Sequence, residues 1–254
     1  MSKLPSSPRA LSIIVPAYNE AGRLQTTVDG VIAAASKVLD HYEVIVVNDG
    51  SSDDTAAIAD GLAASRPQVA VIHHPVNRGV GAGYRSGLQA ARYPSISLVP
   101  GDNAFQPGCL ADFFALVGRA DVIVSYRQNV SARSTARLGL SIIFSTLLRF
   151  ATRLPIRDGH SLYIWPVDLA RKIPVPDDYR YHMTTLVALL RMVPTYAETP
   201  VQLTPNPDAS SRVFRPRVVI GSGLTMLKLI MKNRLGSGSS APLPRAVNLD
   251  ENGS

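Results

Sequence analysis

Two segments of the chain have the same pattern: Ser12-Ile13-Ile14-Val15-Pro16-Ala17-Tyr18-Asn19-Glu20 and, further along, Asn48-Asp49-Gly50-Ser51-Ser52-Asp53-Asp54-Thr55. In each, a short apolar run ends in a polar turn that precedes a helix-like segment. Ligands of open α/β sheets bind at the carboxyl ends of the strands, where the strand order reverses. One such turn is explained equally well by an ordinary capped strand-to-helix connection. The pair together predicts a binding site.

The residue types in these two turns suit a nucleotide. A carboxylate such as Asp49 can accept hydrogen bonds from a nucleobase or a ribose, and Tyr18 can stack beside the base. Gly50 permits a tight turn, and Asp53 or Ser52 can cap the following helix. We therefore expect Asp49→Ala to weaken nucleotide binding and to leave the fold intact.

Around these two turns the chain alternates strand-like and helix-like segments. This alternation predicts βαβ units and an open, mostly parallel sheet with helices on both faces. The strand-like runs are rich in Ile and Val and do not alternate strictly, as in strands buried on both faces. The expected strands are 11–16, 42–48, 69–74, 95–100 and 121–126, and the expected helices are 20–38, 54–65, 81–92 and 107–116.

The second half of the chain follows a different sequence pattern. A basic amphipathic helix is expected over 134–152, then a strand at 162–165, a helix near 184–192 and a strand near 198–203. A last basic helix is expected over 216–234. The domain boundaries that follow are a disordered leader 1–9, a domain 10–215 whose nucleotide-binding half is 10–130 and whose acceptor-facing half is 131–215, that helix, and a disordered tail 235–254.

The charge balance favours an anionic partner. The formal net charge of the 254-residue chain is +7, which fits a nucleotide, a lipid phosphate or an anionic membrane surface. The long basic run around 134–152 is interleaved with aliphatic residues rather than exposed aromatics, which argues against nucleic-acid binding. A single cysteine, Cys109, fits a reducing compartment. No run reaches the roughly 18 apolar residues of a spanning helix.

The strand-end motifs and the run Asn77-Arg78-Gly79-Val80-Gly81-Ala82-Gly83 resemble glycosyltransferase family 2, in the branch of dolichyl-phosphate and polyprenyl-phosphate glycosyltransferases. This resemblance implies a GT-A fold, a nucleotide-diphosphate sugar as donor and Mg²⁺ or Mn²⁺ as cofactor. The glycine-rich run is expected to be a close-packing turn without direct phosphate contacts. The candidate nucleotide-binding residues are Pro16, Ala17, Tyr18, Glu20, Asp49, Ser51, Asp102, Asn103 and Arg212.

The metal motif departs from that family. Where an Asp-x-Asp element is usual, the chain reads Pro100-Gly101-Asp102-Asn103-Ala104, so either Pro100 or Ala104 replaces one aspartate. One carboxylate with substrate phosphates and water can hold such a cation. Asp102 is therefore the candidate metal ligand, and a plain turn residue is the alternative.

The resemblance also implies an acceptor site. The arginine after the fifth strand, Arg127, would bind the acceptor's phosphate, together with Arg133 or Arg137. Asp158 and Ser161 match an Asp-x-x-Ser segment, although the arginine of that segment falls on Ile164. The candidate catalytic residues are Asp102, Arg127 and Asp158.

The sequence thus predicts inverting sugar transfer to a polyprenyl phosphate (dolichyl or undecaprenyl) by a protein bound peripherally at the cytoplasmic face of a membrane. An ionised phosphate needs no general base, and the Glu-Asp and Gln-x-x-Arg-Trp motifs typical of hydroxyl-acting relatives are absent from the sequence. Two alternatives stay open: a hydroxyl acceptor with Asp158 as base, and a non-catalytic relative that only binds nucleotide. The sequence leaves the oligomeric state open.

Overall fold

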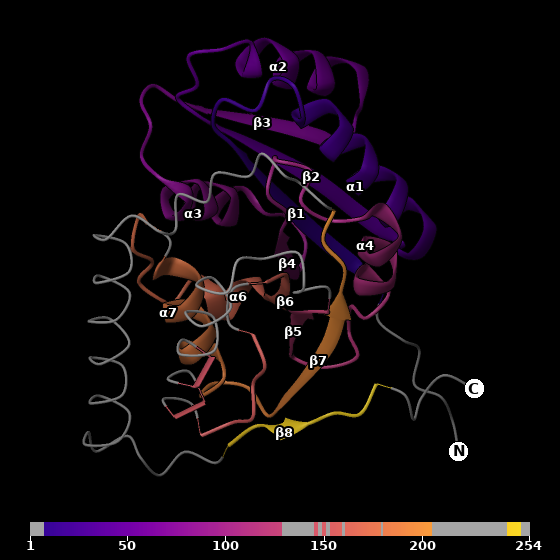
Figure 1. Cartoon of the computed structure of the whole chain (residues 1–254), viewed down its shortest axis with the longest axis vertical. Coiled ribbons are helices and arrows are strands. Elements are labelled where there is room, and N and C mark those ends of the chain that lie inside the picture. The colour runs from indigo at the N-terminus through magenta and orange to yellow at the C-terminus, as the bar shows by residue number, and fades with distance from the viewer. Residues whose placement is uncertain are drawn as a thin grey trace.

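The computed structural model describes residues 8–128, 145–146, 149–150, 153–158, 161–178, 180–204 and 243–249. Its strands and helices alternate through the first half, as the sequence predicts (Figure 1). In chain order the elements are β1 (Ala10–Ala17), α1 (Leu24–Val38), β2 (His41–Asp49), α2 (Thr55–Ser65), β3 (Val69–His74), α3 (Val80–Ala90), β4 (Ser95–Leu98), α4 (Pro107–Phe114), β5 (Val122–Arg127), β6 (Tyr163–Pro166), α6 (Val167–Ala170), α7 (Arg180–Leu189), β7 (Thr195–Val201) and β8 (Arg245–Ala246).

The strands form one eight-stranded sheet in the order β3-β2-β1-β4-β6-β5-β7-β8. Every pairing is parallel except the two made by β6, which runs antiparallel to both β4 and β5. The chain builds β2 and β3 on one side of β1 and then returns to the other side with β4. The order therefore reverses around β1, which is where such sheets bind ligands.

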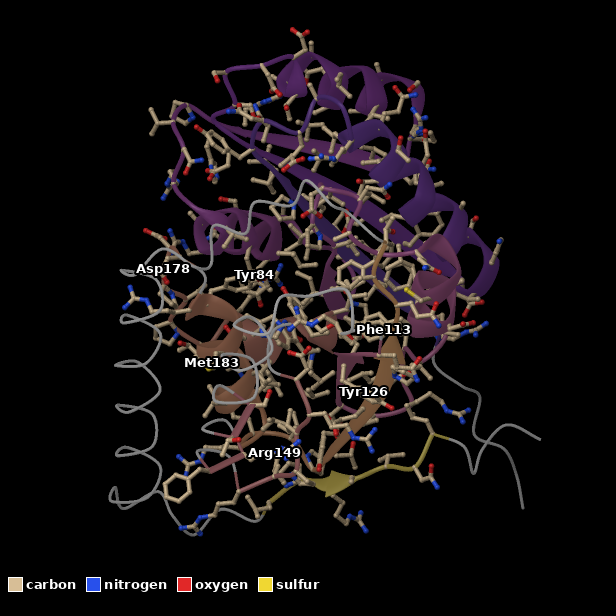
Figure 2. The ribbon with its side chains drawn as sticks, viewed as in Figure 1. Tyr84, Phe113, Tyr126, Arg149, Asp178 and Met183 are labelled. Carbon is tan, nitrogen blue, oxygen red and sulfur yellow. The ribbon has the colours of Figure 1, made fainter. Side chains whose placement is uncertain are left out.

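Helices cover both faces of the sheet because its central strands are apolar on both sides. Ile14, Ile45 and Val47 pack on the face that carries α3 and α7. Ile13 and Val46 pack on the face that carries α1, α2 and α4. Figure 2 shows this division, with Tyr84 and Met183 on the α3/α7 side and Phe113 on the α4 side. The α/β fold with a mostly parallel sheet is confirmed.

Several boundaries differ from the expectation. The helix expected near 184–192 begins four residues earlier, at Arg180, because Asp178 accepts the backbone N–H of Arg180 (3.0 Å) and starts the turn there. It ends at Leu189, after which Met192 N bonds Leu189 O in a tighter turn. The strand expected near 198–203 is 195–201. The short helix α6 was not expected.

Part of the expected disordered tail is ordered. Arg245–Ala246 form β8, which pairs parallel with β7. The backbone N–H of Arg245 bonds Pro194 O (2.8 Å), and that of Val247 bonds Tyr196 O (2.8 Å). Val247 and Leu249 pack against the α1/α4 core, which explains why this segment is held.

The expected basic helices over 134–152 and 216–234 lie almost entirely outside the described residues; only 145–146 and 149–150 of the first are described. Within the parts of the chain that the structure describes, no helix combines the length and the apolar character needed to cross a membrane.

Candidate functional site

The described candidate residues come from the carboxyl-terminal edge of the sheet. β1 ends at Ala17, β2 ends at Asp49, and Asp102 follows β4. Arg127 is the last residue of β5, which runs in the same direction because the single antiparallel strand β6 separates it from β4. The residues expected to bind donor, metal and acceptor therefore share one edge.

The turns after β1 and β2 are tied together by side chains. Asn19 donates its backbone N–H to Ser51 Oγ (3.0 Å), and Ser52 donates its backbone N–H to Asn19 Oδ1 (2.9 Å). Glu20 N donates to Thr55 Oγ1 (2.8 Å). Asn19 has a φ of 57°, which asparagine tolerates better than most residues. Ser51, a candidate nucleotide contact, thus also holds the two turns in place, and Asn19 and Thr55 were not singled out from the sequence.

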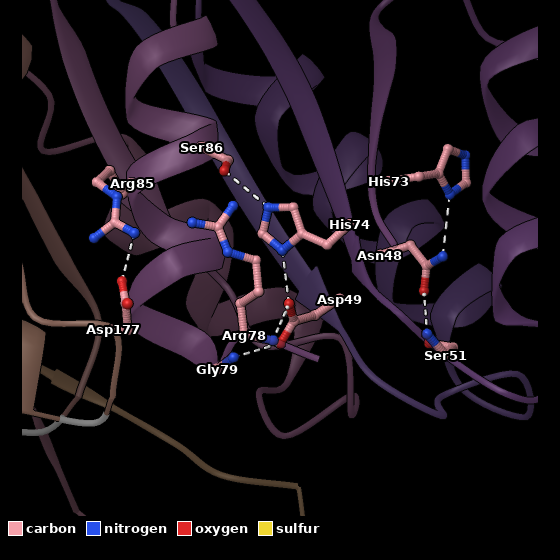
Figure 3. A network of polar contacts seen from close by, with 10 residues as sticks. All are labelled: Asn48, Asp49, Ser51, His73, His74, Arg78, Gly79, Arg85, Ser86 and Asp177. Carbon is pink, nitrogen blue, oxygen red and sulfur yellow. Dashed lines mark hydrogen bonds and ion pairs between the residues drawn. The ribbon is translucent and has the colours of Figure 1, made fainter. Parts of the chain in front are cut away.

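Asp49 is buried at 5 % exposure. Its Oδ1 accepts hydrogen bonds from His74 Nδ1 (2.6 Å) and from the backbone N–H of Arg78 (3.0 Å), and its Oδ2 accepts one from the backbone N–H of Gly79 (2.8 Å) (Figure 3). The carboxylate therefore closes the turn that follows β3 in addition to any contact with a ligand.

These contacts revise the prediction for Asp49→Ala. Its removal leaves buried donors without an acceptor, which costs about 1–3 kcal/mol of stability, so the fold is weakened as well as the nucleotide site. We expect a lower thermal midpoint and weaker nucleoside diphosphate binding by calorimetry. Asp49→Asn is the control that keeps the size of the side chain. A variant with unchanged midpoint and unchanged affinity would contradict both roles.

The glycine-rich turn before α3 packs closely against the backbone of Pro176 and Asp177. Asp177 O accepts the backbone N–H of Gly81 (2.9 Å), which occupies the helix N-terminus. A Cβ at Gly81 would lie 2.0 Å from Pro176 O, so only glycine fits this approach. Arg85 further pairs with the Asp177 carboxylate. The geometry agrees with a close-packing turn.

Asp102 sits on a turn pressed against β1. Gly101 N donates to Pro16 O (3.1 Å), and Thr27 Oγ1 of α1 lies 3.0 Å from Gly101 O. The turn continues through Asn103, with a φ of 57°, and is held on its far side by Gln106 N bonding Gln202 O (3.3 Å). Burial raises the pKa of Asp102, although backbone hydrogen bonds and the charge of Arg23 lower it in part.

The surroundings of Asp102 fit a cation ligand. Its Oδ1 is buried and has no hydrogen-bond partner among the described residues, and a buried carboxylate oxygen without a donor is stabilised by a metal ion. Among those residues no group of three or more His, Cys, Asp or Glu side chains gathers to form a complete protein cage. The donor set therefore suits a cation that takes its remaining ligands from substrate phosphates and water.

Arg127 and Asp158, expected as acceptor ligand and catalytic residue, form an ion pair. Arg127 Nε lies 2.6 Å from Asp158 Oδ2, and Nη2 lies 3.1 Å from Oδ1, with side-chain exposures of 16 % and 10 %. Guanidinium has five N–H donors, and the pair uses two of them. Beside it, Ser125 Oγ and Ser161 Oγ are 2.7 Å apart, so β5 and the segment before β6 are joined at two points.

Further arginines near this pair also have partners. The backbone N–H of Arg157 bonds Glu198 Oε1 (2.7 Å), and its guanidinium lies 4.5 Å from the centre of the Tyr126 ring. Arg149 Nε bonds Ile156 O (2.9 Å). Figure 2 shows Tyr126 and Arg149 in the same part of the molecule. Burial raises the pKa of Glu198, and the nearby arginines partly offset this increase.

Some candidate residues lie outside the described residues, and their placement stays a prediction: Arg133, Arg137 and Arg212. Sequence reasoning also missed His74. The available signal was the pair His73-His74 at the end of the expected strand 69–74.

Comparison with known proteins gives the family. The model of glycosyl transferase family 2 matches residues 12–166. A dolichyl-phosphate beta-glucosyltransferase of Trichomonas vaginalis is 36% identical over 98 residues, which are 37% of this chain and 29% of that protein. Glycosyltransferase AglD of Haloferax volcanii is 29% identical over 229 residues, 86% of this chain and 36% of that protein. The chain thus spans about a third of the length of these relatives.

Solved structures share the fold. Glucosyl-3-phosphoglycerate synthase from Mycobacterium tuberculosis in complex with UDP superposes with a TM-score of 0.65 at 16% identity, covering 87% of this chain and 80% of that one. The mannosyltransferase PcManGT from Pyrobaculum calidifontis, in complex with GDP-Man and Mn²⁺, gives 0.61 at 19% identity, covering 92% and 66%. With the family match covering β1 through β6 and the expected turns at the sheet edge, the chain belongs to glycosyl transferase family 2.

Proposed function

We propose that the protein is an inverting glycosyltransferase that moves a sugar from a nucleotide-diphosphate sugar to a polyprenyl phosphate. The observation that carries this proposal is the Arg127–Asp158 pair at the end of β5, on the same sheet edge as Asp49 and Asp102. It offers a fixed cationic group for an anionic acceptor beside a site suited to a nucleotide diphosphate.

The donor side is supported by the turns after β1, β2 and β4. Pro16 and Ala17 end β1, and Tyr18 and Glu20 lie on the turn that follows it. These residues would enclose the nucleoside together with Asp49. Proteins of similar fold were solved with UDP-glucose or GDP-mannose, which supports a nucleotide sugar without specifying the base.

A divalent cation, Mg²⁺ or Mn²⁺, would be held by Asp102, with Asn103 beside it. When bound, such an ion offsets charge on the leaving diphosphate. The protein's own part is to hold the turn that carries Asp102 in place, through the contacts of Gly101 with Pro16 O and Thr27. One protein carboxylate predicts weaker metal affinity than two would give.

The acceptor side favours a phosphate over a hydroxyl. The three N–H donors of Arg127 that Asp158 leaves unused can bind phosphate oxygens. Asp158 is a poor candidate for a general base, because both of its oxygens accept hydrogen bonds from Arg127. A phosphate monoester has a second pKa of about 6, so its oxygen can attack the anomeric carbon while the bond to the diphosphate breaks. Catalysis then consists of positioning and electrostatic stabilisation.

The test is a transfer assay with two acceptors. Purified protein with Mn²⁺ and a panel of UDP- and GDP-sugars should yield a polyprenyl-phosphate sugar, identified by mass spectrometry. Its release as phosphate and inverted sugar on mild acid would fix the linkage. Transfer only to soluble hydroxyl acceptors would contradict the proposed acceptor. Failure to bind any nucleoside diphosphate would contradict the proposal as a whole.

A lipid acceptor implies that the protein works at a membrane surface, and we propose peripheral binding at the cytoplasmic face. Arg149 and Arg153 are exposed, as is Phe150 at 47 %. Basic residues near an anionic surface contribute about 1 kcal/mol each, and an exposed aromatic ring can enter the headgroup region.

Reversing both charges, Arg149→Glu with Arg153→Glu, should weaken binding to anionic vesicles by at least about thirty-fold, as measured by flotation at low salt. The control is Lys37→Glu with Arg119→Glu, which makes the same charge change at two other exposed positions. Nucleotide binding should be unchanged in both. Failure of the wild-type protein to bind the vesicles would contradict the surface placement and favour a soluble acceptor.

A further inference from the structure

His73 and His74 occupy the end of β3 directly beside the Asn48-Asp49 pair of β2. The parallel register places Asn48 opposite His73 and Asp49 opposite His74. Each histidine bonds the side chain of its register partner, His73 Nδ1 to Asn48 Nδ2 at 3.0 Å and His74 Nδ1 to Asp49 Oδ1 at 2.6 Å. Figure 3 shows the two rings pointing to opposite sides of the strand, as successive strand residues do.

The two histidines differ in their surroundings. The side chain of His73 is 40% exposed, and its Nε2 lies 3.0 Å from Asp60 Oδ1 at the surface. The side chain of His74 is 5% exposed, and its Nε2 lies 2.9 Å from Ser86 Oγ on α3. His74 thus links β3, β2 and α3 through a single buried ring (Figure 3).

The chemistry of the partners fixes the proton on His74. An ionised carboxylate only accepts hydrogen bonds, so Nδ1 must carry a hydrogen and donate it to Asp49. In the neutral ring Nε2 is then an acceptor, and the Ser86 hydroxyl donates to it. A defined tautomer keeps the ring, and with it the Asp49 carboxylate, in one orientation.

Asp49 keeps one acceptor position for a ligand. A carboxylate has about four lone-pair sites, two on each oxygen. Oδ1 uses both, for His74 and the Arg78 N–H, whereas Oδ2 uses one, for the Gly79 N–H. His74, together with the N–H groups of Arg78 and Gly79, therefore orients the remaining Oδ2 position.

The turn held by Asp49 packs closely against Gly50. Gly50 has a φ of 68°, and a Cβ there would lie 2.5 Å from Val76 C. The backbone at Val76 thus lies against the residue that follows Asp49, so we expect a rotated carboxylate to shift this turn.

We infer that His74 is a positioning residue for the donor nucleotide, acting through Asp49 and the turn that Arg78 and Gly79 form. This inference rests on the proposed function, in which Asp49 contacts the nucleoside. A histidine that merely filled the core would affect stability alone, whereas a positioning residue affects the affinity of the folded protein for nucleotide.

The test compares three variants in the full chain. His74→Leu removes the donor to Asp49 and should weaken UDP or GDP binding, measured by calorimetry with Mn²⁺, by at least tenfold. It should raise the KM for the donor sugar nucleotide while changing kcat less than threefold. His74→Asn offers a side-chain N–H in place of Nδ1–H and should recover affinity to within threefold of wild type. The matched control His73→Asn, on the exposed side of the same strand, should change affinity less than twofold.

A direct probe uses the wild-type protein. The chain has 5 histidines, so ¹⁵N spectra of their rings are simple to assign with the variants. The resonance of the His74 Nδ1 proton should be present in the free protein and should shift when UDP or GDP is added.

The outcomes separate the two claims. If wild-type protein binds neither UDP nor GDP, the proposed function fails. If wild type binds and a folded His74→Leu variant binds within twofold of it, the positioning role is overturned and the proposed function stands. A His74 ring resonance unchanged at saturating nucleotide also overturns the positioning role, even if His74→Leu does not fold.

Discussion

Asp102→Asn should abolish metal-dependent sugar transfer while making the metal-free protein slightly more stable. Asp102 supplies the carboxylate of the metal motif, and its Oδ1 is buried without a hydrogen-bond partner among the described residues. We expect kcat with Mn²⁺ to fall at least a hundredfold, which corresponds to about 2.7 kcal/mol of transition-state stabilisation. The lost ligand charge leaves the cation without its protein anchor.

The stability change has the opposite sign for a physical reason. Burial raises the pKa of Asp102, which means that the folded protein disfavours the ionised carboxylate present at neutral pH. The amide of asparagine removes that cost. A gain of about 1 kcal/mol raises the thermal midpoint of a chain of this size by about 2–4 °C.

Scanning calorimetry with and without Mn²⁺ separates the effects. Wild type should be stabilised by Mn²⁺ in the presence of UDP, and Asp102→Asn should not. The control Asp112→Asn changes a carboxylate on the surface side of α4 and should respond to Mn²⁺ as wild type does. Near wild-type turnover by Asp102→Asn would place the metal at another residue.

Arg127→Ala should remove acceptor binding and leave donor binding intact. With a polyprenyl phosphate acceptor we expect kcat/KM to fall by at least a hundredfold, about 2.7 kcal/mol, because of the two substrates only the acceptor contacts the guanidinium in the proposed arrangement. Arg127→Lys keeps the charge but cannot reproduce the two-point contact with Asp158, so it should recover activity only in part. Isothermal titration with UDP or GDP should be unchanged in both variants.

Asp158→Ala tests the role of Asp158 as the ion-pair partner of Arg127. Breaking a buried ion pair from one side costs about 3–5 kcal/mol, so this variant should be markedly less stable. Asp158→Asn retains an oxygen acceptor for Arg127 and should keep measurable transfer to polyprenyl phosphate. If Asp158→Asn lost all transfer while its fold and its acceptor KM were preserved, Asp158 would be acting as a base, and a hydroxyl acceptor would be favoured.

The sequence predicts much of the fold because its signals are local. Apolar runs such as 11–16 and 42–48, each followed by a polar turn, are enough to locate β1 and β2 and to expect a ligand at their ends. The direction of β6, in contrast, could not be predicted from the sequence. The run Leu162–Trp165 indicates a strand, but a four-residue apolar segment carries no information about which neighbours it pairs with or in which sense.

The site is predicted in part for the same reason. Asp49 and Asp102 follow apolar runs and can be recognised from their turns. The partner of Asp49, His74, is 25 positions away and depends on the register between β2 and β3. Likewise the ion pair of Arg127 with Asp158 joins residues 31 positions apart. The two-residue strand β8 has no periodicity from which it could be inferred.

The antiparallel strand β6 has a consequence for how the chain is made. Tyr163–Pro166 sits between β4 and β5, so the sheet centre is filled by residues that follow both neighbours in the chain. During synthesis β4 and β5 emerge first and face each other across an open gap with unpaired backbone edges. A nascent chain stopped after Arg127 therefore cannot complete its sheet, and we expect the donor-binding and acceptor-binding portions to become stable together, only after Pro166 has left the ribosome.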